Sequence, residues 1–238
     1  MDNNALVLAR GVTARNGRGF ALGPVDLSLS EGVTCLVGAN GAGKSTLFRV
    51  LVGIQKATGG LIQFADHRPS IGYLPQEPEL PPLALAGGYL DHVAWLQGIR
   101  RGERAAAVDT ALAAAGMTDR SSSPIRKLSG GMRRRLAFAG AIVNQPRLLL
   151  LDEPTVGLDP IQRERIRQLV KATAPNRAVL LSTHLLEDVR ALAAHVVILA
   201  AGRVVFSGAP AQLTSTPTGS ANYAVDFDAA AALMAVDE

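Results

Sequence analysis

The stretch Gly38-Ala39-Asn40-Gly41-Ala42-Gly43-Lys44-Ser45, followed by Thr46, decides most of what this sequence predicts. It fits the pattern G-x-x-x-x-G-K-[ST], with an apolar run typical of a buried strand before it (33–37) and a helical run after it (44–52). Glycines let the backbone wrap closely enough for successive N–H groups to point at phosphate oxygens, and the helix start adds partial positive charge there. The stretch therefore predicts a phosphate-binding site.

The polar side chains of this loop have expected roles. Lys44 supplies a full positive charge to the β- and γ-phosphates of a nucleotide and is a candidate catalytic residue, and the Ser45 hydroxyl can ligate Mg²⁺. The residues expected to contact the nucleotide are Gly38, Asn40, Gly41, Gly43, Lys44, Ser45 and Thr46.

Two carboxylates end the apolar run Leu148-Leu149-Leu150-Leu151-Asp152-Glu153. Four apolar residues predict a buried strand, and ligands of open α/β sheets bind at the carboxyl ends of such strands. Asp152 is placed to hold Mg²⁺, directly or through water, and Glu153 to orient or deprotonate an attacking water. An apolar strand that ends in Asp-Glu is common by itself, so this interpretation depends on the phosphate loop upstream.

A second glycine-bearing helix start lies at Leu128-Ser129-Gly130-Gly131-Met132. Its backbone N–H groups can bind an anion, and Ser129 adds a hydroxyl donor. In isolation the stretch is also typical of an ordinary helix cap. Together with the first loop, it suggests a nucleotide gripped from two sides.

The order of the remaining segments predicts an α/β fold. From 147 onward a strand (147–151), helix (161–172), strand (178–182), helix (185–194) and strand (196–200) alternate, which indicates a parallel sheet covered on both faces. Before them come β-like runs, then strands at 61–64 and 71–74, then an Ala- and Leu-rich helical part (88–116) broken near 98–102. We expect Trp95 to be buried in that helical part. We expect Arg133, Arg134 and Arg135 to fan out around their helix as a solvated face.

Composition narrows the class of protein. The chain has 238 residues, 48% of them hydrophobic, and its net charge of +4 permits nucleic acid, an anionic membrane or a nucleotide as partner. Aromatic residues make up 4%, which disfavours stacking on bases, and we expect no nucleic-acid partner. The most apolar stretch (191–201) is too short to span a bilayer, and residues 1–4 lack the basic start of a secretion signal, so we expect a cytoplasmic protein. The single cysteine, Cys35, excludes an internal disulfide, and its apolar surroundings predict a buried thiol.

These motifs resemble those of the ATP-binding cassette (ABC) transporter ATPases, over roughly residues 5–215. Residues 38–46 resemble the Walker A loop, 148–153 the Walker B strand and 128–132 the signature motif. The resemblance implies a P-loop NTPase cassette with a RecA-like parallel-sheet core, an N-terminal antiparallel β subdomain and a small helical subdomain at about 77–145. It implies a single ATPase domain over 1–215, and the tail at 216–238 receives no role.

Three more positions match the family's motifs. Gln76, after Ile71-Gly72-Tyr73-Leu74-Pro75, resembles the Q-loop glutamine, which implies contact with Mg²⁺ or water and with the membrane partner. Asp159, in Gly157-Leu158-Asp159-Pro160, resembles the D-loop and implies nucleotide contact. His184 resembles the switch histidine that reaches the γ-phosphate, and so is a candidate catalytic residue.

The resemblance also implies partners. ATP would lie between the Walker A loop of one subunit and the signature of the other, so that Ser129 and Gly131 serve the partner's nucleotide. The second subunit would be an identical copy or a second, pseudo-symmetric cassette. A separately encoded membrane-spanning permease would bind the dimer at the inner face of the cell membrane, and overall similarity favours export.

Two departures and two alternatives accompany this interpretation. The signature's usual final glutamine is Met132, a variant associated with exporter-like members, and the adenine-stacking aromatic aligns with Asn16, with Phe20 the nearest aromatic. One alternative is a soluble cassette that acts on ribosomes or DNA, although such relatives usually carry two cassettes or long coiled-coil insertions. The other is a nucleotide-gated module without turnover, against which the intact catalytic residues argue.

Overall fold

The computed structural model describes residues 5–15, 19, 21–65 and 69–213. By their internal packing, the described residues divide into two compact units. The first unit contains those up to 65 and those from 174 onward, and the second contains 69–173. The predicted phosphate loop belongs to the first unit, and the predicted carboxylates belong to the second.

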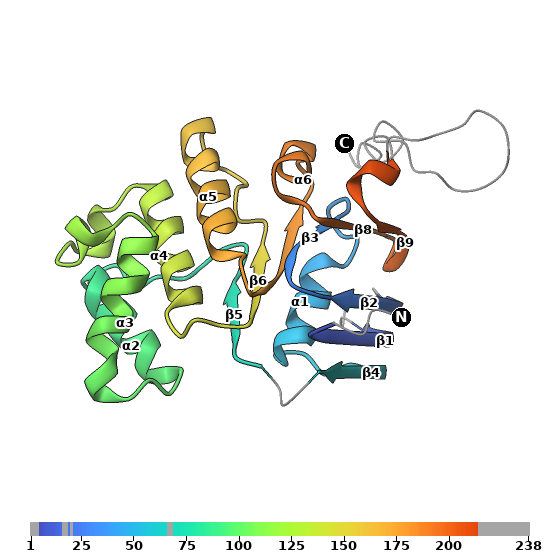
Figure 1. The fold of residues 1–238 in the computed structure, drawn as a ribbon, viewed down its shortest axis with the longest axis horizontal. Helices are drawn as coiled ribbons and strands as arrows, with labels where there is room; N and C mark the ends of the chain where they lie inside the picture. The colour runs from blue at the N-terminus through green and yellow to red at the C-terminus, as the bar shows by residue number, and fades with distance from the viewer. Residues whose placement is uncertain (1–4, 16–18, 20, 66–68, 214–238) are drawn as a thin grey trace, which may run out of the picture. The chain divides into compact units, whose positions relative to one another are not determined.

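Three antiparallel strands form one sheet of the first unit (Figure 1). They are β1 (Val7–Arg15), β2 (Ala21–Leu29) and β4 (Gly59–Phe64), in the order β2-β1-β4. The strongly buried positions of β1 recur at near-alternate residues, because one face of such a sheet packs on the core while the other is more open. This sheet confirms the predicted antiparallel β part.

Parallel pairing builds the second sheet of this unit. Strand β3 (Gly32–Val37) lies between β7 (Ala178–Thr183) and β8 (His195–Ala200), parallel to both. Strand β9 (Arg203–Gly208) pairs antiparallel with β8. All six residues of β7 are buried, which is why these strands read as continuous apolar runs.

Two helices pack on these strands. Helix α1 (Lys44–Val52) follows β3 and packs against β1. Its end at Gly53 has a left-handed backbone, and the Gly53 N–H donates to Val50 O, as in a glycine C-cap. Helix α6 (Leu186–Leu192) packs on β3 and β7, and a short 3₁₀ segment follows at Pro210–Leu213.

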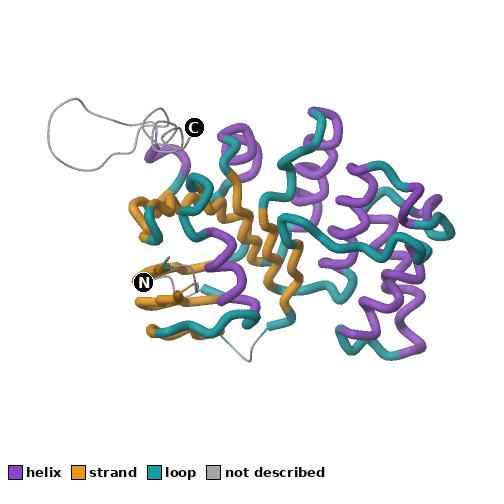
Figure 2. The backbone as a smooth tube through the Cα atoms, turned by 180° about the vertical axis from the view of Figure 1, so that it is seen from behind, coloured by secondary structure: helices purple, strands orange, loops and turns teal. Residues whose placement is uncertain are grey.

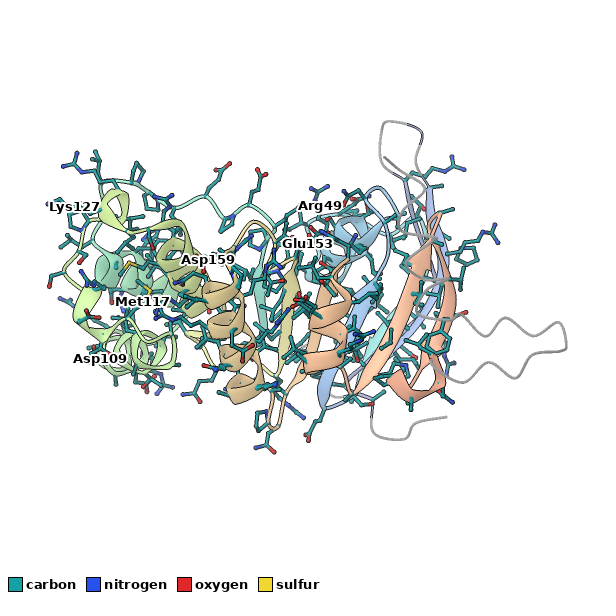
Figure 3. The ribbon with its side chains drawn as sticks, turned by 90° about the horizontal axis from the view of Figure 1, so that it is seen from above. Arg49, Asp109, Met117, Lys127, Glu153 and Asp159 are labelled. Carbon is teal, nitrogen blue, oxygen red and sulfur yellow. The ribbon has the colours of Figure 1, made fainter. Side chains whose placement is uncertain are left out.

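The second unit is mostly helical. Its strands β5 (Ile71–Leu74) and β6 (Leu148–Asp152) pair in parallel. Its helices are α2 (Ala86–Leu96), α3 (Arg101–Ala114), α4 (Gly130–Ile142) and α5 (Pro160–Thr173), with 3₁₀ turns at Thr118–Arg120 and Ile125–Lys127. Helices α2, α3 and α4 pack against one another (Figure 2), and Met117 is fully buried where α3 ends (Figure 3).

The predicted elements are largely confirmed. The helix at 44–52 and the strand at 71–74 have the predicted bounds, and the predicted break in the helical part separates α2 from α3. Strand β9 was not predicted. Within the described part of the chain, no helix has the length and apolar character to cross a membrane.

The predicted burial of Trp95 is wrong. Its side chain is 56% exposed and lies against the ring of His92, with centroids 5.5 Å apart. The buried positions of α2 are Ala86, Leu90 and Ala94, spaced four residues apart. Trp95 lies one position beyond that stripe, and a step of one residue turns a side chain about 100° around a helix.

The predicted solvated face at residues 133–135 is also wrong for two of its three members. The side chains fan out as expected, and Arg133 is exposed. Arg135, however, is 9% exposed and donates to the carbonyl oxygens of Ala115 (3.1 Å) and Gly116 (2.9 Å). Arg134 is half-buried and donates to main-chain carbonyls. A guanidinium carries five donors and can satisfy several carbonyls at once, which lets it be buried.

Candidate functional site

The loop between β3 and α1 has the backbone of an anion cradle. Gly41 and Gly43 have φ of +81° and +106°, in the left-handed region that glycine adopts without steric cost. At Gly38 a Cβ would lie 2.3 Å from Leu199 O, so this position also requires glycine. The loop therefore wraps tightly into the start of α1, where the first-turn N–H groups and the helix dipole favour anions.

Lys44 is folded back over its own loop. Its side chain is 5% exposed, and Nζ donates to Gly38 O at 2.6 Å and to Ala39 O at 3.0 Å. A buried ammonium is costly unless paired or hydrogen-bonded, and these carbonyls hold it at the loop. Thr46 is buried, Ser45 is half-buried, and Asn40 is exposed.

The predicted carboxylates lie at the end of β6. Asp152 and Glu153 are 1% and 4% exposed, and the four leucines before them are fully buried. Glu153 has φ of +47°, a left-handed conformation that costs a non-glycine residue about 1–3 kcal/mol. Such strain persists only where the surrounding structure enforces it, which marks Glu153 as a constrained position.

Gln76 and Glu153 meet within the second unit. Gln76 Nε2 donates to Glu153 Oε2 at 3.3 Å, across the ends of the paired strands β5 and β6. The Gln76 side chain is otherwise exposed. The sequence placed each residue at the end of a strand, and the parallel pairing brings the two ends to the same edge.

The second glycine-bearing helix start is capped by its own serine. Ser129 Oγ accepts a hydrogen bond from Met132 N at 3.3 Å, and both Ser129 and Gly130 are exposed. Gly131 is buried, and a Cβ there would meet Gln162 Oε1 of α5 at 2.5 Å. That Gln162 oxygen is itself buried without a hydrogen-bond partner. The cap leaves the other first-turn N–H groups of α4 available.

The two remaining predicted residues follow strands. Asp159 is exposed and caps α5, accepting from Gln162 N at 2.9 Å, and it follows Glu153 in the same unit (Figure 3). His184 is half-buried just after β7. Beside it, Thr183 Oγ1 donates to the fully buried Asp188 at 3.1 Å and accepts from Leu185 N, which fixes the turn that carries His184.

Three residues that contact the predicted site residues or their neighbours were not predicted to do so: Arg134, which was expected on a solvated face, and Gln162 and Asp188. Burial lowers the pKa of the Arg134 guanidinium, while the carboxylates of Glu153, Asp152 and Glu77 oppose that shift. Asp188 also contributes to the raised pKa of Cys35, about 12, which results first from burial. The predicted burial of Cys35 is thus confirmed.

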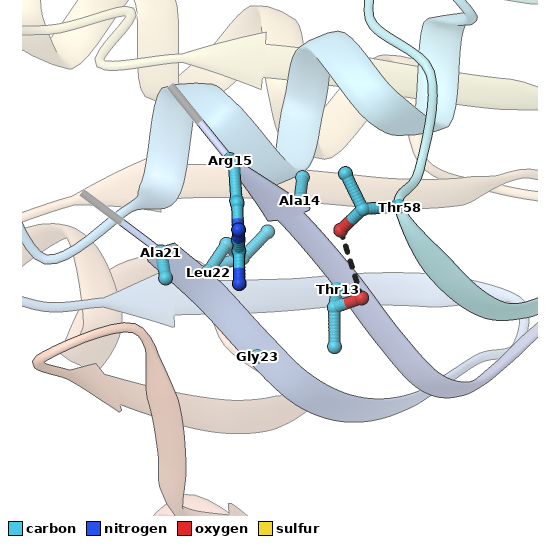
Figure 4. Close-up of a pocket in the computed structure, with 7 residues that line it drawn as sticks. All are labelled: Thr13, Ala14, Arg15, Ala21, Leu22, Gly23 and Thr58. Carbon is cyan, nitrogen blue, oxygen red and sulfur yellow. Dashed lines mark hydrogen bonds between the residues drawn. The ribbon is translucent and has the colours of Figure 1, made fainter. Parts of the chain in front are cut away.

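A cavity opens at the ends of β1 and β2 in the first unit (Figure 4). Its volume is about 460 Å³, and Arg15, Ala21 and Thr58 are among its lining residues. Thr13 Oγ1 and Thr58 Oγ1 share a hydrogen bond of 3.0 Å at its edge. Asn16 and Phe20, the positions considered for adenine stacking, lie outside the described residues.

Within each unit, the predicted site residues lie where strands end and where helices begin. The first unit holds Lys44, its loop and His184, and the second holds Gln76, Ser129, Gly131, Asp152, Glu153 and Asp159. No group of three or more His, Cys, Asp or Glu side chains able to hold a metal occurs among the described residues. Oxygen ligands are nevertheless present in Ser45, Gln76 and Asp152, the type that Mg²⁺ prefers when phosphates complete its shell.

Comparison with known proteins gives concordant results. A sequence profile of the family described as ABC transporter matches residues 22–156. The chain is 33% identical over 236 residues to the Nod factor export ATP-binding protein I of Cupriavidus metallidurans, covering 90% of this chain and 75% of that protein. It is 36% identical over 187 residues to the ABC-type organic anion transporter ABCA8B of Mus musculus, covering 76% of this chain but only 12% of that protein.

Solved structures agree with the sequence relatives. The structure of cbiO1 from Clostridium perfringens, part of the ABC transporter complex cbiONQ, superimposes with a TM-score of 0.77 at 29% identity. The match covers 87% of this chain and 90% of that one.

Proposed function

Because the chain belongs to the ABC transporter family of ATP-binding proteins, we propose that it binds and hydrolyses ATP to drive a separate membrane-spanning permease. Its α/β fold is that of the family's P-loop NTPase cassette. The observation that carries the proposal is the loop that ends β3: glycines with positive φ wrap into the start of α1, and the buried Lys44 ammonium is held over them. That arrangement is suited to a triphosphate.

In the proposed reaction, ATP and water give ADP and phosphate. The loop N–H groups and Lys44 bind the β- and γ-phosphates and neutralise the charge that moves during transfer. Glu153 orients the attacking water and accepts its proton, and Gln76 holds the Glu153 carboxylate through the 3.3 Å hydrogen bond. His184 contacts the γ-phosphate, and Asp159 lies at the nucleotide's edge.

Mg²⁺ would be held by Ser45, Asp152 and Gln76. The ion would neutralise phosphate charge when bound with ATP. Each of these residues offers a hard oxygen ligand, and Mg²⁺ usually takes few protein ligands besides substrate phosphates. The residues present therefore fit the ion.

We propose that the active form is a dimer of cassettes, with each ATP between two chains. The exposure of Ser129 and Gly130 supports this, because a helix start open to solvent can meet a phosphate brought by another molecule. Gly131 would contact the same phosphates. A second copy of this chain, or a second cassette, would supply the opposite loop.

Export is the proposed direction, at the inner face of the cell membrane. The support is the relative named as a Nod factor export protein, of which the chain covers 75%. In this proposal the permease chooses the cargo. Co-purification in detergent with the product of an adjacent membrane-protein gene tests this role, and recovery of ribosomes or DNA instead would favour the non-transport alternative.

The decisive test is Glu153→Gln. Turnover should fall about a hundredfold or more, because the water loses its base, while ATP binding persists. A malachite-green phosphate assay and calorimetric titration with Mg-ATP measure the two effects. The same variant should shift from monomer to dimer on size exclusion when ATP is added, since a bound, unhydrolysed nucleotide holds both chains. Wild-type turnover in Glu153→Gln would contradict the role of Glu153 as the base. A monomer at saturating ATP would contradict the proposed dimer with ATP between its two chains.

A further inference from the structure

Arg134 of α4 reaches two separate segments of the second unit. Its Nη1 donates to Gln76 O at 2.6 Å and, at longer range, to Pro75 O at 3.4 Å. Its Nη2 donates to Glu153 O at 3.4 Å and Val156 O at 3.5 Å. One guanidinium therefore joins the turn after β5 to the turn after β6.

The shortest of these bonds is the strongest anchor. A charged donor at 2.6 Å from a carbonyl oxygen is a short, charge-assisted hydrogen bond. The planar fork of arginine then directs its other nitrogen toward Glu153 and Val156, which the single point charge of lysine cannot do simultaneously. The position is half-buried, so water competes only partly for these carbonyls.

The contacts are made to the main chain of the two residues whose side chains meet. Gln76 Nε2 and Glu153 Oε2 are hydrogen-bonded, and Arg134 holds the carbonyl oxygens of the same two residues. Glu153 has a left-handed backbone, which persists only when neighbours hold it. The Glu153 carbonyl also accepts from Val156 N at 3.4 Å, so Arg134 reinforces that turn.

We infer that Arg134 is a positioning residue for ATP hydrolysis, which ties the Gln76 and Glu153 turns together and fixes the Glu153 carboxylate for its task. The inference rests on the proposed function of Glu153. Arg134 touches no reacting atom in this scheme and acts through the main chain. The two turns then move as one body, so a displacement of the Gln76 turn is transmitted to Glu153.

Substitution of Arg134 tests the inference. In Arg134→Ala, kcat for ATP should fall about 10- to 100-fold, because small misplacement of a catalytic group has effects of that size. The Kd for Mg-ATP should stay within about twofold, since the phosphate loop is untouched. Arg134→Lys should lie between the two, because lysine can reach one carbonyl but not bridge both turns. Millimolar guanidinium chloride, but not equal sodium chloride, should partly restore kcat in Arg134→Ala.

The matched control is Arg100→Ala, which removes an arginine of the same unit whose side chain is 87% exposed. It should leave kcat and Kd unchanged. Hydrogen exchange provides a readout besides activity: in Arg134→Ala, peptides covering 71–78 and 150–158 should both exchange faster, and in Arg100→Ala neither should.

The outcomes separate this inference from the proposed function. If the wild type hydrolyses ATP and Glu153→Gln does not, but Arg134→Ala matches the wild type in kcat, the Arg134 inference alone is overturned. Faster exchange in only one of the two peptides also overturns it. If Arg134→Ala does not fold, Arg134→Lys serves as the test. A wild-type kcat in Arg134→Lys would contradict the claim that Arg134 must join the Gln76 and Glu153 turns. Absence of wild-type hydrolysis would instead remove the proposed function itself.

Discussion

The two glycine-bearing helix starts of this protein are built in opposite ways. At the start of α1, the Lys44 side chain is buried and bound to carbonyls of its own loop, and the N-cap Gly43 makes no side-chain cap. At the start of α4, Ser129 caps its own helix and is exposed together with Gly130. The first start carries a buried cation beside its loop, whereas the second presents an exposed, serine-capped helix end. Under the proposed function, the first start would bind the chain's own nucleotide and the second would contact the nucleotide of a partner chain.

The largest effect should come from Lys44→Ala. Removing the buried Lys44 ammonium, which is held by the carbonyls of its own loop, would lower turnover about 100- to 1,000-fold, the usual cost of losing one preorganised charge-stabilising group. ATP binding should weaken as well, measured by calorimetric titration with Mg-ATP. Lys171→Ala, which removes an exposed lysine of α5, is the matched control and should behave as the wild type. Unchanged turnover in Lys44→Ala would show that the cation at the start of α1 has no role in hydrolysis, so it would not distinguish this helix start from the start of α4.

A smaller effect should follow from Gly131→Ala. A Cβ there would meet Gln162 Oε1 at 2.5 Å and stand at the helix start expected to face the partner's nucleotide. Turnover should fall about tenfold, equivalent to about 1.4 kcal/mol, while ATP binding to the monomer persists. The melting temperature should fall too.

The double variant Gly131→Ala with Gln162→Ala separates packing from binding. Removing the Gln162 side chain should restore the melting temperature, because the crowded atoms are gone, but should not restore turnover. Recovery of turnover in the double variant would mean that Gly131 is needed only for packing on α5. The control is Gln162→Ala alone.

The smallest expected effect concerns Cys35 of β3, the strand that leads into the loop before α1. Burial and then Asp188 raise the pKa of the Cys35 thiol from 9.0 to about 12. The Cys35 thiol ionises at a lower pH in the unfolded chain than in the folded one. The buried thiol's contribution to the free energy of unfolding is therefore fully present below pH 9, and it is lost as the pH rises toward 12. The loss is up to about 1.4 kcal/mol per pH unit in that window.

Urea unfolding at mildly and strongly alkaline pH, for wild type and Cys35→Ala, isolates this contribution. Between about pH 8 and about pH 10, the wild type should lose roughly 1.4 kcal/mol more stability than Cys35→Ala. Equal losses would show that β3 does not exclude water from the Cys35 thiol.

Most of the fold followed from local pattern. The helix at 44–52, the strand at 71–74 and the alternation of strands and helices after 147 are confirmed. These elements could be predicted because the spacing of apolar residues and the glycines at the ends of elements are local features of the sequence. Strand β9 was missed because it lies at an antiparallel edge of its sheet, where five of its six residues are exposed or half-buried and give no continuous apolar run. The site residues were identified from sequence motifs, and their roles remain predictions that the experiments above test.

Side-chain environments were predicted less well. Trp95 and Arg134 were assigned to the wrong surroundings, because neither periodicity nor composition states which partner packs on which turn of a helix. Gln162 and Asp188 lie in no motif, yet both contact residues beside the site. Local pattern did not identify these contacts, because Gln162 meets Gly131 across two different helices, and Asp188 meets Thr183 across the turn between β7 and α6.

The sequence by itself determined the α/β class, the glycine-rich loop with Lys44 and the carboxylates at the end of β6. Each of these depends on residue types at fixed short spacings, where backbone geometry leaves few choices. Only the tertiary structure decided that Gln76 meets Glu153 and that Arg134 ties both turns together. Those contacts require strands β5 and β6 to pair in parallel and α4 to pack beside them, and pairing and packing are set by the whole folded unit rather than by any one segment.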